Sequence, residues 1–262
     1  GLGDVYKRQV EGSVDPIRDI EIINLELIMA DLQTIENRLS KVERKAMTNK
    51  DKDAIAEVNV LKKLQAALEA GKPVRSLDLE KEEQLLIKAF NLLTLKPMIY
   101  IANMSDEEIA EPENNPYYQK VKELADSEHN QVVPVCAKIE EELSGLDKEE
   151  KNAFLQELGI PESGLDKVIK TAYQILNLCT FLTAGEDECR AWTFRKGMLA
   201  PQCAGVIHTD FEKGFIRAEC YRFEDIDALG SEQAIKEAGK LRLEGKEYEV
   251  QDGDVLHFRF NV

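Results

Sequence analysis

The residues with the clearest potential for chemistry are Asn103, Met104, Ser105 and Asp106, which directly follow the apolar run PMIYIA at 97–102. Side chains at the carboxyl end of a buried strand lie where open α/β sheets bind their ligands. A carboxylate there can accept hydrogen bonds from the ring and amino N–H groups of a purine, while an amide side chain fixes the loop. Taken alone, the four residues also fit an ordinary turn, because Asn and Asp are common where a strand ends.

A second loop of related chemistry, CAK at 136–138, follows the next apolar run, QVVPV at 131–135. An expected helix at 116–127 separates the two loops. In guanine-binding proteins an NKxD loop and an SAK loop contact the base from two sides, and here Met104 stands in place of the Lys. Two such loops in this order, at the carboxyl ends of consecutive strands, predict a nucleotide site.

Residues that would hold phosphates or a metal are not found in the sequence. No GxxxxGK[ST] motif occurs in the 262 residues. Phosphoryl transfer depends on a backbone cradle, a Lys and magnesium ligands, so we assign no catalytic or metal-ligating residue. We expect the chain as given not to hydrolyse ATP. The five cysteines, at 136, 179, 189, 203 and 220, lack the spacing of a zinc site.

Charge and hydropathy exclude several classes of function. Fifty acidic side chains against 34 basic ones give a net charge of -16, which argues against binding to nucleic acid through the overall field. Any RNA contact must therefore come from a local patch. The apolar runs are far shorter than the ~20 residues needed to cross a bilayer, so no membrane location is expected. Scattered cysteines without pair spacing predict reduced thiols in a cytoplasmic protein.

An antiparallel helical hairpin is predicted at 33–80. Apolar residues from 25 to 46 recur with alternating gaps of three and four, which makes one apolar seam on a long helix. After a polar break at 48–53, a second helical run carries a similar seam from 55 to 68. Two seams joined by a short turn can cover each other, and the alternative is two ordinary bundle helices.

The segments at 10–32 and 81–177 predict an incomplete, doubly wound α/β domain. The elements expected in it are a helix at 80–93, strands at 97–103 and 131–137, and helices at 116–127, 147–158 and 163–177. Apolar runs between helices are typical of a buried parallel sheet. The first nine residues, GLGDVYKRQ, begin without Met and show no periodicity. We interpret residues 1–9 as a scar left by sequencing or cloning.

A separate carboxyl-terminal domain is predicted at 178–262. Its strand-like runs are CTFLTAG, RAWTFRKG, GFIRAECYRF and KEYEVQDGDVLHFRFNV. Glycines and a DGD turn separate these runs, and one helix is expected near 231–239. This pattern predicts a small mixed sheet wrapped on one helix.

A local basic patch lies in this carboxyl-terminal segment. Its members are Arg190, Arg195, Lys196, Lys213 and Arg217. Between 190 and 217 these five cations face two acidic residues, a local charge of +3. The aromatic residues interleaved with them are Trp192, Phe194, Phe211 and Phe215. Cations beside aromatics suit phosphate contact and base stacking, so we predict an RNA contact through the basic residues. The alternative for the aromatics, which we favour, is a small core.

Four segments resemble one known family. They are DPIRDIEIINLELIMADL at 15–32, NMSD at 103–106, FLTAGEDECRAWTFRKGMLAPQCAGVIHTDFEKGFIRAE at 181–219 and VQDGDVLHFRFN at 250–261. From about Val10 onward the chain resembles the carboxyl-terminal part of an Obg-like ATPase of the YchF subfamily, truncated at its amino terminus. The resemblance implies an α/β fold with an incomplete P-loop domain, a coiled-coil insertion and a TGS domain of ubiquitin-like β-grasp form.

The resemblance also assigns roles to the two loops. Asn103 and Met104 are expected to lie against the adenine, and Asp106 takes the position where guanine readers keep their Asp. Cys136 and Ala137 replace Ser-Ala of the second loop, where backbone N–H groups make most of the contact. Many relatives have Glu at the position of Asp106, so adenine or guanine preference stays open. The intact protein is implied to use ATP, or GTP, with Mg²⁺.

Two hypotheses about function follow. In the first, the chain is part of a ribosome-associated nucleotide hydrolase that prefers ATP, with the large ribosomal subunit and ribosomal RNA as partners. In the second, it is a non-enzymatic RNA or ribosome adaptor without nucleotide hydrolysis. Either is expected to be a cytoplasmic monomer. An in-frame GxxxxGK[ST] upstream of Val10 would favour the first. His208 and Asp210, which invite a catalytic interpretation, are expected to form a turn or helix cap.

Overall fold

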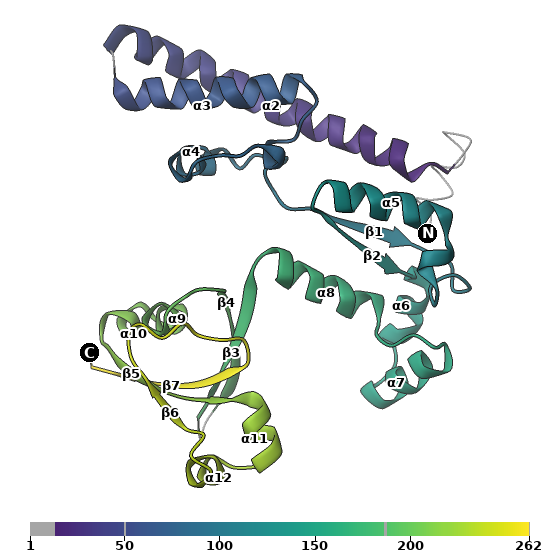
Figure 1. The fold of residues 1–262 in the computed structure, drawn as a ribbon, viewed down its shortest axis with the longest axis vertical. Coiled ribbons are helices and arrows are strands. Elements are labelled where there is room, and N and C mark those ends of the chain that lie inside the picture. The colour runs from purple at the N-terminus through teal and green to yellow at the C-terminus, as the bar shows by residue number, and fades with distance from the viewer. Residues whose placement is uncertain (1–13, 50, 186–187, 262) are drawn as a thin grey trace. The chain divides into compact units, whose positions relative to one another are not determined.

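The computed structural model describes residues 14–49, 51–185 and 188–261 (Figure 1), so the predicted scar at 1–9 lies outside them. The chain divides into two compact units, Gly1–Thr171 and Ala172–Val262. The boundary falls within helix α8 (Gly164–Ile175), a few residues before the predicted start of the carboxyl-terminal domain. None of the helices in the described ranges has an apolar stretch that could cross a bilayer.

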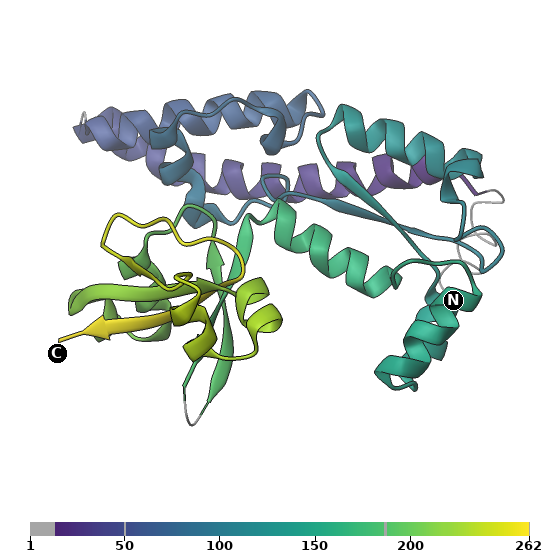
Figure 2. The same cartoon turned by 60° about the horizontal axis from the view of Figure 1, so that its bottom comes forward.

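The predicted hairpin is formed by α2 (Pro16–Asn49) and α3 (Lys52–Glu69), which lie side by side in Figures 1 and 2. The two seams meet in one apolar cluster that includes Ile35 and Leu39 of α2 and Leu61 and Leu64 of α3. Asp51 caps α3 by accepting a hydrogen bond from the Asp53 N–H (3.0 Å). The alternating three- and four-residue gaps therefore predicted the packing of this pair.

A short segment at the base of the hairpin is less helical than predicted. It contains η1 (Val74–Ser76), α4 (Lys81–Ile87) and η2 (Lys88–Phe90). The helix expected at 80–93 stops early because Asn91 adopts the left-handed conformation (φ 50°), which Asn tolerates and which ends a helix. The buried Asp31 carboxylate of α2 then accepts hydrogen bonds from the Leu93 N–H (2.8 Å) and the Thr94 N–H (2.7 Å).

The α/β part contains two parallel strands, β1 (Ile99–Asn103) and β2 (Gln131–Val135), in register from Ile99–Gln131 to Asn103–Val135. Helix α5 (Pro116–Ser127), preceded by η3 (Pro112–Asn114), connects them. Tyr100, Val121 and Ala125 form the core between sheet and helix. This parallel pair with a crossover helix confirms the expected α/β fold.

The second predicted strand is too long at its carboxyl end. It stops at Val135, and α6 (Ala137–Ser144) begins at Ala137, followed by α7 (Lys148–Glu157) and α8. Sequence reasoning missed α6 because its apolar face consists of only Ile139 and Leu143 among acidic residues. Both side chains are buried in a cluster with Ile109 and Leu155. This packing stabilises α6, which is too short to be stable by itself.

The second unit is a five-stranded mixed sheet in the order β4-β3-β7-β5-β6. Its strands are β3 (Leu178–Ala184), β4 (Cys189–Arg195), β5 (Phe215–Arg222), β6 (Arg242–Glu244) and β7 (Asp254–Phe260). The central strands β3 and β7 are parallel, with Leu182 opposite Val255, whereas the other neighbours are antiparallel. A parallel central pair flanked by antiparallel strands is the expected β-grasp arrangement.

The prediction of a single helix in this unit was wrong. The structure has α9 (Ala200–Ile207), α10 (Thr209–Lys213), α11 (Phe223–Leu229) and α12 (Glu232–Glu237). The segment APQCAGVI suggests a loop because of its Pro and Gly, but the Pro lies in the first turn of α9, where it is tolerated. We call the sheet face covered by α9 and α10 the inner face, and the face covered by α11 and α12 the outer face.

Candidate functional site

The two predicted loops lie next to each other in the first unit. The Met104 N–H donates to the Val135 carbonyl (2.8 Å), so the parallel pairing continues one residue past β1. The Asn103 Oδ1 accepts a hydrogen bond from the Ala137 N–H (3.1 Å) across the two loops. Because Ala137 is the first residue of α6, Asn103 also satisfies an amide that has no partner within that helix.

The side chains of Met104 and Cys136 both pack into the apolar cluster beneath the loops. Cys136 is only 3% exposed, and Met104 is half-buried against the same cluster. The Cys136 thiol therefore contributes to the core, and the Ala137 N–H, one of the backbone donors expected to contact a base, donates to Asn103. Met104 also lines the pocket described below, so it contacts both the core and solvent.

Asp106 forms an ion pair with Lys138 of the second loop, with 2.5 Å between Nζ and Oδ2. The hydrogen bond from Lys138 lowers the pKa of the Asp106 carboxyl below its usual value, and the same contact raises the pKa of Lys138. Both side chains remain exposed, at 44% and 65%. The carboxylate expected to meet guanine N–H groups is thus already paired with a cation.

Sequence reasoning missed Glu108, which organises the first loop. Its carboxylate accepts hydrogen bonds from the Ser105 hydroxyl (2.8 Å) and the Asn115 side-chain amide (2.8 Å). These contacts lower the pKa of Glu108. Asn115 in turn caps α5 by accepting from the Tyr117 N–H (2.8 Å). The acidic run DEE at 106–108 by its composition indicates only a solvated face, and the position of Asn115 before Pro116 is the one local signal of a cap.

A pocket of about 920 Å³ opens beside β1 and the first loop. Its lining comes from the start of α2, from β1, from the loop and from α5, and includes Asn103, Met104, Ser105, Glu108 and Tyr117. Asp106, Cys136 and Ala137 do not line it. The Tyr117 side chain, 46% exposed, offers an aromatic ring at the rim. The pocket therefore combines an amide, hydroxyl and carboxylate group with apolar and aromatic surface, which suits a small planar ligand.

The five basic residues of the predicted patch are all exposed but do not share one surface. Arg190 lies on the inner face of β4, with its guanidinium 4.3 Å from the ring centre of Trp192. Arg195 and Arg217 lie on the outer face, but on β4 and β5, which β3 and β7 separate. Three strand spacings put these two strands about 14 Å apart.

The remaining two cations lie at the ends of elements. Lys196 follows β4 directly, next to Arg195, and Lys213 is the last residue of α10 on the inner face. The structure therefore brings Arg195 and Lys196 together and leaves Lys213 and Arg190 on the other side of the sheet. Extended RNA could contact residues of both faces only by passing an edge of the sheet.

The aromatic residues of this segment belong to the core of the unit, as we favoured. Phe194 and Phe215 are buried, and Phe211 stacks on Phe260 with ring centres 3.8 Å apart. Trp192 is half-buried, and its indole N–H donates to the Thr183 hydroxyl (2.9 Å). His208 caps α10 by accepting from the Asp210 N–H (3.2 Å), which confirms the expected cap. Within the described ranges, no group of three or more His, Cys, Asp or Glu residues could hold a metal ion.

Comparison with known proteins relates both units to one family. The family model YchF-GTPase_C, described as "Protein of unknown function (DUF933)", matches residues 178–261. The chain is 57% identical over 253 residues to the ribosome-binding ATPase YchF of Bacillus subtilis, covering 97% of this chain and 69% of that protein. It is 52% identical to the protein of the same name from Haemophilus influenzae, with the same coverage.

Solved structures agree with these sequence matches. The YchF GTPase of Schizosaccharomyces pombe superimposes with a TM-score of 0.83 at 37% identity, over 95% of this chain and 68% of that one. A GTP binding protein from Pyrococcus horikoshii has a TM-score of 0.59 at 20% identity, which shows a shared fold alone, over 94% of this chain and 72% of that one. The sequence identity, its extent and the shared fold together show that the chain belongs to the YchF family.

Proposed function

We propose that this chain carries the base-binding side and the ribosome-binding unit of a nucleotide hydrolase that prefers ATP. The observation that supports it most is the hydrogen bond from the Ala137 N–H to the Asn103 side chain. It joins two loops at the carboxyl ends of adjacent parallel strands, where open α/β sheets bind ligands. The names of the relatives, which are ribosome-binding ATPases, support the partner and the reaction.

The adenine is proposed to lie between the Asn103–Asp106 loop and the start of α6. Asn103 and Ala137 hold the two loops at a fixed separation, and Met104 presents an apolar side chain at the pocket beside them. Ser105 does not offer its hydroxyl proton, because it donates to Glu108. In this arrangement Met104 supplies the apolar contact that a planar ring needs, because the Met104 and Ala137 N–H groups already donate within the protein.

The ion pair between Asp106 and Lys138 supports the proposed preference for ATP. Guanine reading requires a carboxylate that accepts from two N–H groups of the base, but Lys138 already donates to Asp106. Adenine does not present two such N–H donors to this carboxylate. The ion pair between Asp106 and Lys138 therefore weakens the binding of ATP less than that of GTP. GTP would have to compete with Lys138 for the carboxylate, which weakens its binding relative to ATP.

Phosphate and Mg²⁺ binding is not assigned to residues of this chain. The 262 residues contain no GxxxxGK[ST] motif, and the described ranges hold no cluster of metal ligands. The two loops of this chain can contact the base, but no residue of the chain is assigned to the triphosphate or its metal. Hydrolysis is therefore proposed only for a YchF protein in which a phosphate loop accompanies these two loops.

The second unit is proposed to bind ribosomal RNA of the large subunit. Arg195 and Lys196 are adjacent and exposed, and Arg217 lies on the same sheet face as Arg195. A chain with a net charge of -16 needs such a local cationic surface to approach phosphates. Arg190 and Lys213 are proposed as secondary contacts from the other face. We further propose that the protein acts as a monomer in the cytoplasm.

Nuclear magnetic resonance of the isotope-labelled chain tests the base site directly. Adding ATP should shift the amide resonances of Met104, Ala137 and Lys138 in a saturable manner, and GTP should do so at higher concentration. Asn103→Ala should abolish saturation, whereas Asn103→Asp, which keeps an acceptor oxygen, should retain part of it. Shifts at unrelated amides only, or equal responses in Asn103→Ala, would contradict the proposed site.

Ribosome sedimentation separates the hydrolase from the adaptor hypothesis. A YchF chain with a phosphate loop should bind ribosomes with an affinity that differs between ATP and ADP, if hydrolysis is coupled to binding. Identical sedimentation with ATP, ADP and no nucleotide would favour the non-enzymatic adaptor.

A further inference from the structure

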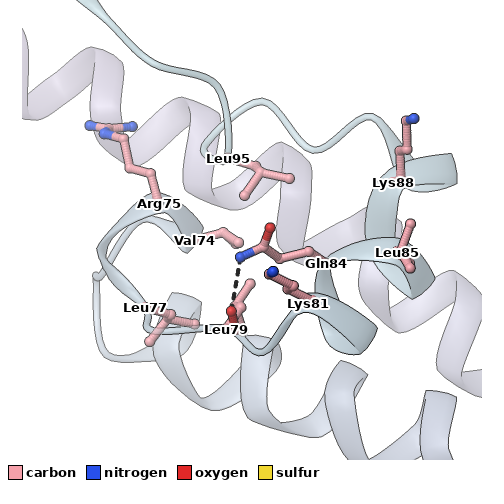
Figure 3. Close-up of a pocket in the computed structure, with 9 residues that line it drawn as sticks. All are labelled: Val74, Arg75, Leu77, Leu79, Lys81, Gln84, Leu85, Lys88 and Leu95. Carbon is pink, nitrogen blue, oxygen red and sulfur yellow. Dashed lines mark hydrogen bonds between the residues drawn. The ribbon is translucent and has the colours of Figure 1, made fainter. Parts of the chain in front are cut away.

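A groove at the base of the hairpin lies apart from both proposed sites. It has a volume of about 660 Å³ (Figure 3). The lining side chains are Val74, Arg75, Leu77, Leu79, Lys81, Gln84, Leu85, Lys88 and Leu95. Five of the nine are aliphatic, three are cationic and none is acidic. We call this feature the Lys81–Lys88 groove.

The floor and the rim of the groove differ in exposure. Val74 and Leu79 are buried at 0% and 7% exposure, and they belong to the main core of the hairpin. Leu85, by contrast, is 71% exposed at the rim. A large aliphatic side chain held in solvent next to an apolar depression is typical of a surface that binds another apolar group.

The two lysines follow the helical repeat of α4 and its continuation η2. Lys81, Leu85 and Lys88 are spaced i, i+4 and i+7, so they lie on one side of the helix, and Gln84 at i+3 accompanies them. Seven residues correspond to a rise of about 10 Å. The rim therefore presents an apolar residue between two cations about 10 Å apart.

Neither lysine is neutralised within the described residues. Glu83 of α4 pairs with Lys63 of α3 (2.9 Å). Glu80 and Glu82 flank Lys81 in the sequence, but no ion pair joins them to it within the described residues. Lys81 and Lys88 form no ion pair with any carboxylate in the described ranges. Two unpaired lysines therefore stand beside an apolar groove in a chain with a net charge of -16.

We propose that the Lys81–Lys88 groove binds an acidic amphipathic helix of a partner protein. Leucine-like side chains of that helix would fill the depression above Val74 and Leu79, while two carboxylates spaced i and i+7 meet Lys81 and Lys88. Gln84 is held by a hydrogen bond from its Nε2 to the Leu79 carbonyl (2.8 Å), so its Oε1 can accept a hydrogen bond from the partner.

The lining favours a peptide over a nucleic acid. Unpaired bases bind to proteins by stacking on aromatic rings or guanidinium planes. The groove has no aromatic residue in its lining, and the side chain of Arg75, the one arginine of that lining, is only 11% exposed. The aliphatic floor offers nothing to a phosphate backbone. A peptide with aliphatic side chains flanked by carboxylates matches both the aliphatic floor and the lysines at the rim.

A labelled synthetic helix tests the proposal on the full chain. The probe is an alanine-rich peptide with glutamates at i and i+7 and leucines at i+3 and i+4, and its binding is measured by fluorescence anisotropy. A control peptide carries the glutamates on the opposite face at the same net charge. We expect saturable binding of the probe, with the control peptide at least ~10-fold weaker because its carboxylates cannot reach both lysines.

Protein variants complete the test. Lys81→Glu with Lys88→Glu should weaken probe binding at least ~10-fold, and Leu85→Ser should weaken it by loss of apolar contact. The matched control, Lys120→Glu with Lys148→Glu, makes the same charge change at exposed positions of α5 and α7 and should leave binding within about twofold. These are all exposed residues, and circular dichroism checks that each variant is folded.

Three results would overturn the proposal. The first is absence of saturable probe binding to the chain. The second is equal loss of binding in the groove variant and the matched control, which would show attraction by net charge alone. The third is binding of a single-stranded RNA oligonucleotide that depends on Lys81 and Lys88 while the peptide does not bind.

Discussion

Lys138 and Asp106 join the two loops at the carboxyl ends of β1 and β2, with 2.5 Å between the ammonium nitrogen and the carboxylate oxygen. The residues are 32 positions apart in sequence, and parallel strand pairing brings them together. The contact lowers the pKa of Asp106, so its carboxylate stays ionised as pH falls into the range where Asp is usually protonated. In the proposed base site, this pair therefore occupies the carboxylate that guanine N–H groups would need.

Removing the lysine should change base selectivity. In a YchF chain with a phosphate loop, Lys138→Ala leaves Asp106 free to accept guanine N–H groups, so GTP should bind more tightly relative to ATP. Asp106→Asn should have the opposite effect, since an amide is a poorer acceptor for two donors. The ratio of the ATP and GTP dissociation constants, from calorimetry, measures both. Parallel changes for the two nucleotides would show that the pair only shapes the turn.

The link between the loops should also contribute to stability. Asn103→Ala removes the acceptor for the Ala137 N–H and should lower the free energy of unfolding by about 1 kcal/mol. Urea denaturation followed by circular dichroism measures the change. Asn103→Asp keeps the acceptor and serves as the control. A loss of the same size in both variants would show that the amide nitrogen, rather than the oxygen, is the group that matters.

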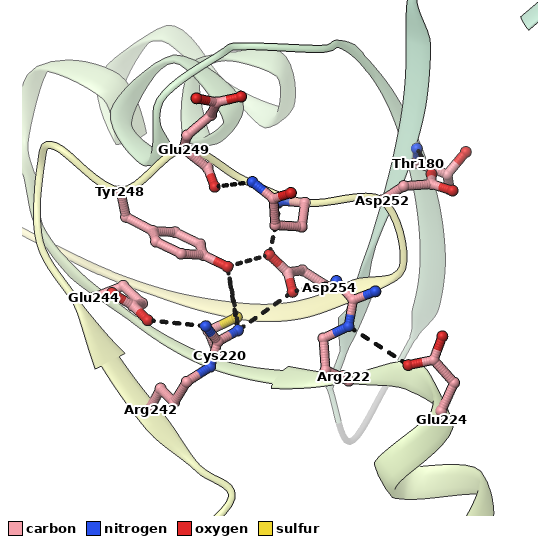
Figure 4. A network of polar contacts seen from close by, with 11 residues as sticks. Thr180, Cys220, Arg222, Glu224, Arg242, Glu244, Tyr248, Glu249, Asp252 and Asp254 are labelled. Atoms are coloured by element: carbon pink, nitrogen blue, oxygen red, sulfur yellow. Dashed lines mark hydrogen bonds and ion pairs between the residues drawn. The ribbon is translucent and has the colours of Figure 1, made fainter. Parts of the chain in front are cut away.

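A buried carboxylate organises the second unit (Figure 4). Asp254 is 0% exposed and accepts hydrogen bonds from the Tyr248 hydroxyl (2.7 Å) and the Gln251 N–H (2.9 Å). It also pairs with Arg222 (3.2 Å) and Arg242 (3.4 Å). Asp254 therefore connects β5, β6 and β7 with the loop that precedes β7.

Asp254→Ala should destabilise this unit strongly. It leaves a tyrosine hydroxyl, a backbone N–H and two guanidinium groups without their shared acceptor. Because Arg222 and Arg242 are 35% and 42% exposed, solvent compensates part of the loss, and the expected cost is about 2–3 kcal/mol. Trp192, the only tryptophan of the chain, reports unfolding of this unit by fluorescence. The control is Glu224→Ala, since the Glu224 side chain is 76% exposed and its pair with Arg222 should contribute less than about 1 kcal/mol. Equal effects of the two substitutions would contradict the prediction.

Alkaline pH should weaken the second unit through its buried thiols. Burial raises the pKa of both Cys203 and Cys220 to about 12, from an ordinary value of 9.0. Between these values the unfolded chain loses protons that the folded chain retains, so the free energy of unfolding falls as pH rises. Burial raises the pKa of Tyr221 and Tyr248 as well, in the same direction.

Urea titrations monitored by Trp192 between pH 8 and pH 12 test this dependence, because this range contains the interval between the ordinary thiol pKa of 9.0 and the raised pKa of about 12. Cys203→Ala with Cys220→Ala should flatten the decline while lowering stability overall. In the folded protein a thiol reagent should modify the exposed Cys189 and leave Cys203 unmodified. Rapid labelling of Cys203 in the folded state would show that it is not buried.

Ribosome binding should depend on salt and on the outer face of the sheet. Arg195→Glu with Lys196→Glu should weaken sedimentation with ribosomes and lower the slope of log affinity against log salt by about one for each lost phosphate contact. Arg190→Glu, on the inner face, should have the smaller effect. Binding that is indifferent to salt and to the double reversal would remove these residues from the interface.

The amino-acid sequence by itself determined the local elements and their broad order. The three- and four-residue gaps of α2 and α3 predicted the hairpin, because a helix that repeats apolar residues in this way has one face to bury. The apolar runs at β1, β2, β3 and β5 predicted strands for the same reason. The cap formed by His208 and the Asn-Met-Ser-Asp loop after β1 were predicted from residue type and position alone.

Only the tertiary structure decided which of these residues meet. The pairs Asp31–Thr94, Asp106–Lys138 and Asn103–Ala137 join residues more than 30 positions apart, and no local pattern contains them. Helix α6 depends on two buried side chains, and α9 on a Pro that suits a first turn. The basic residues between 190 and 217 were separated in the fold, because alternate residues of β4 face opposite sides and because β3 and β7 lie between β4 and β5.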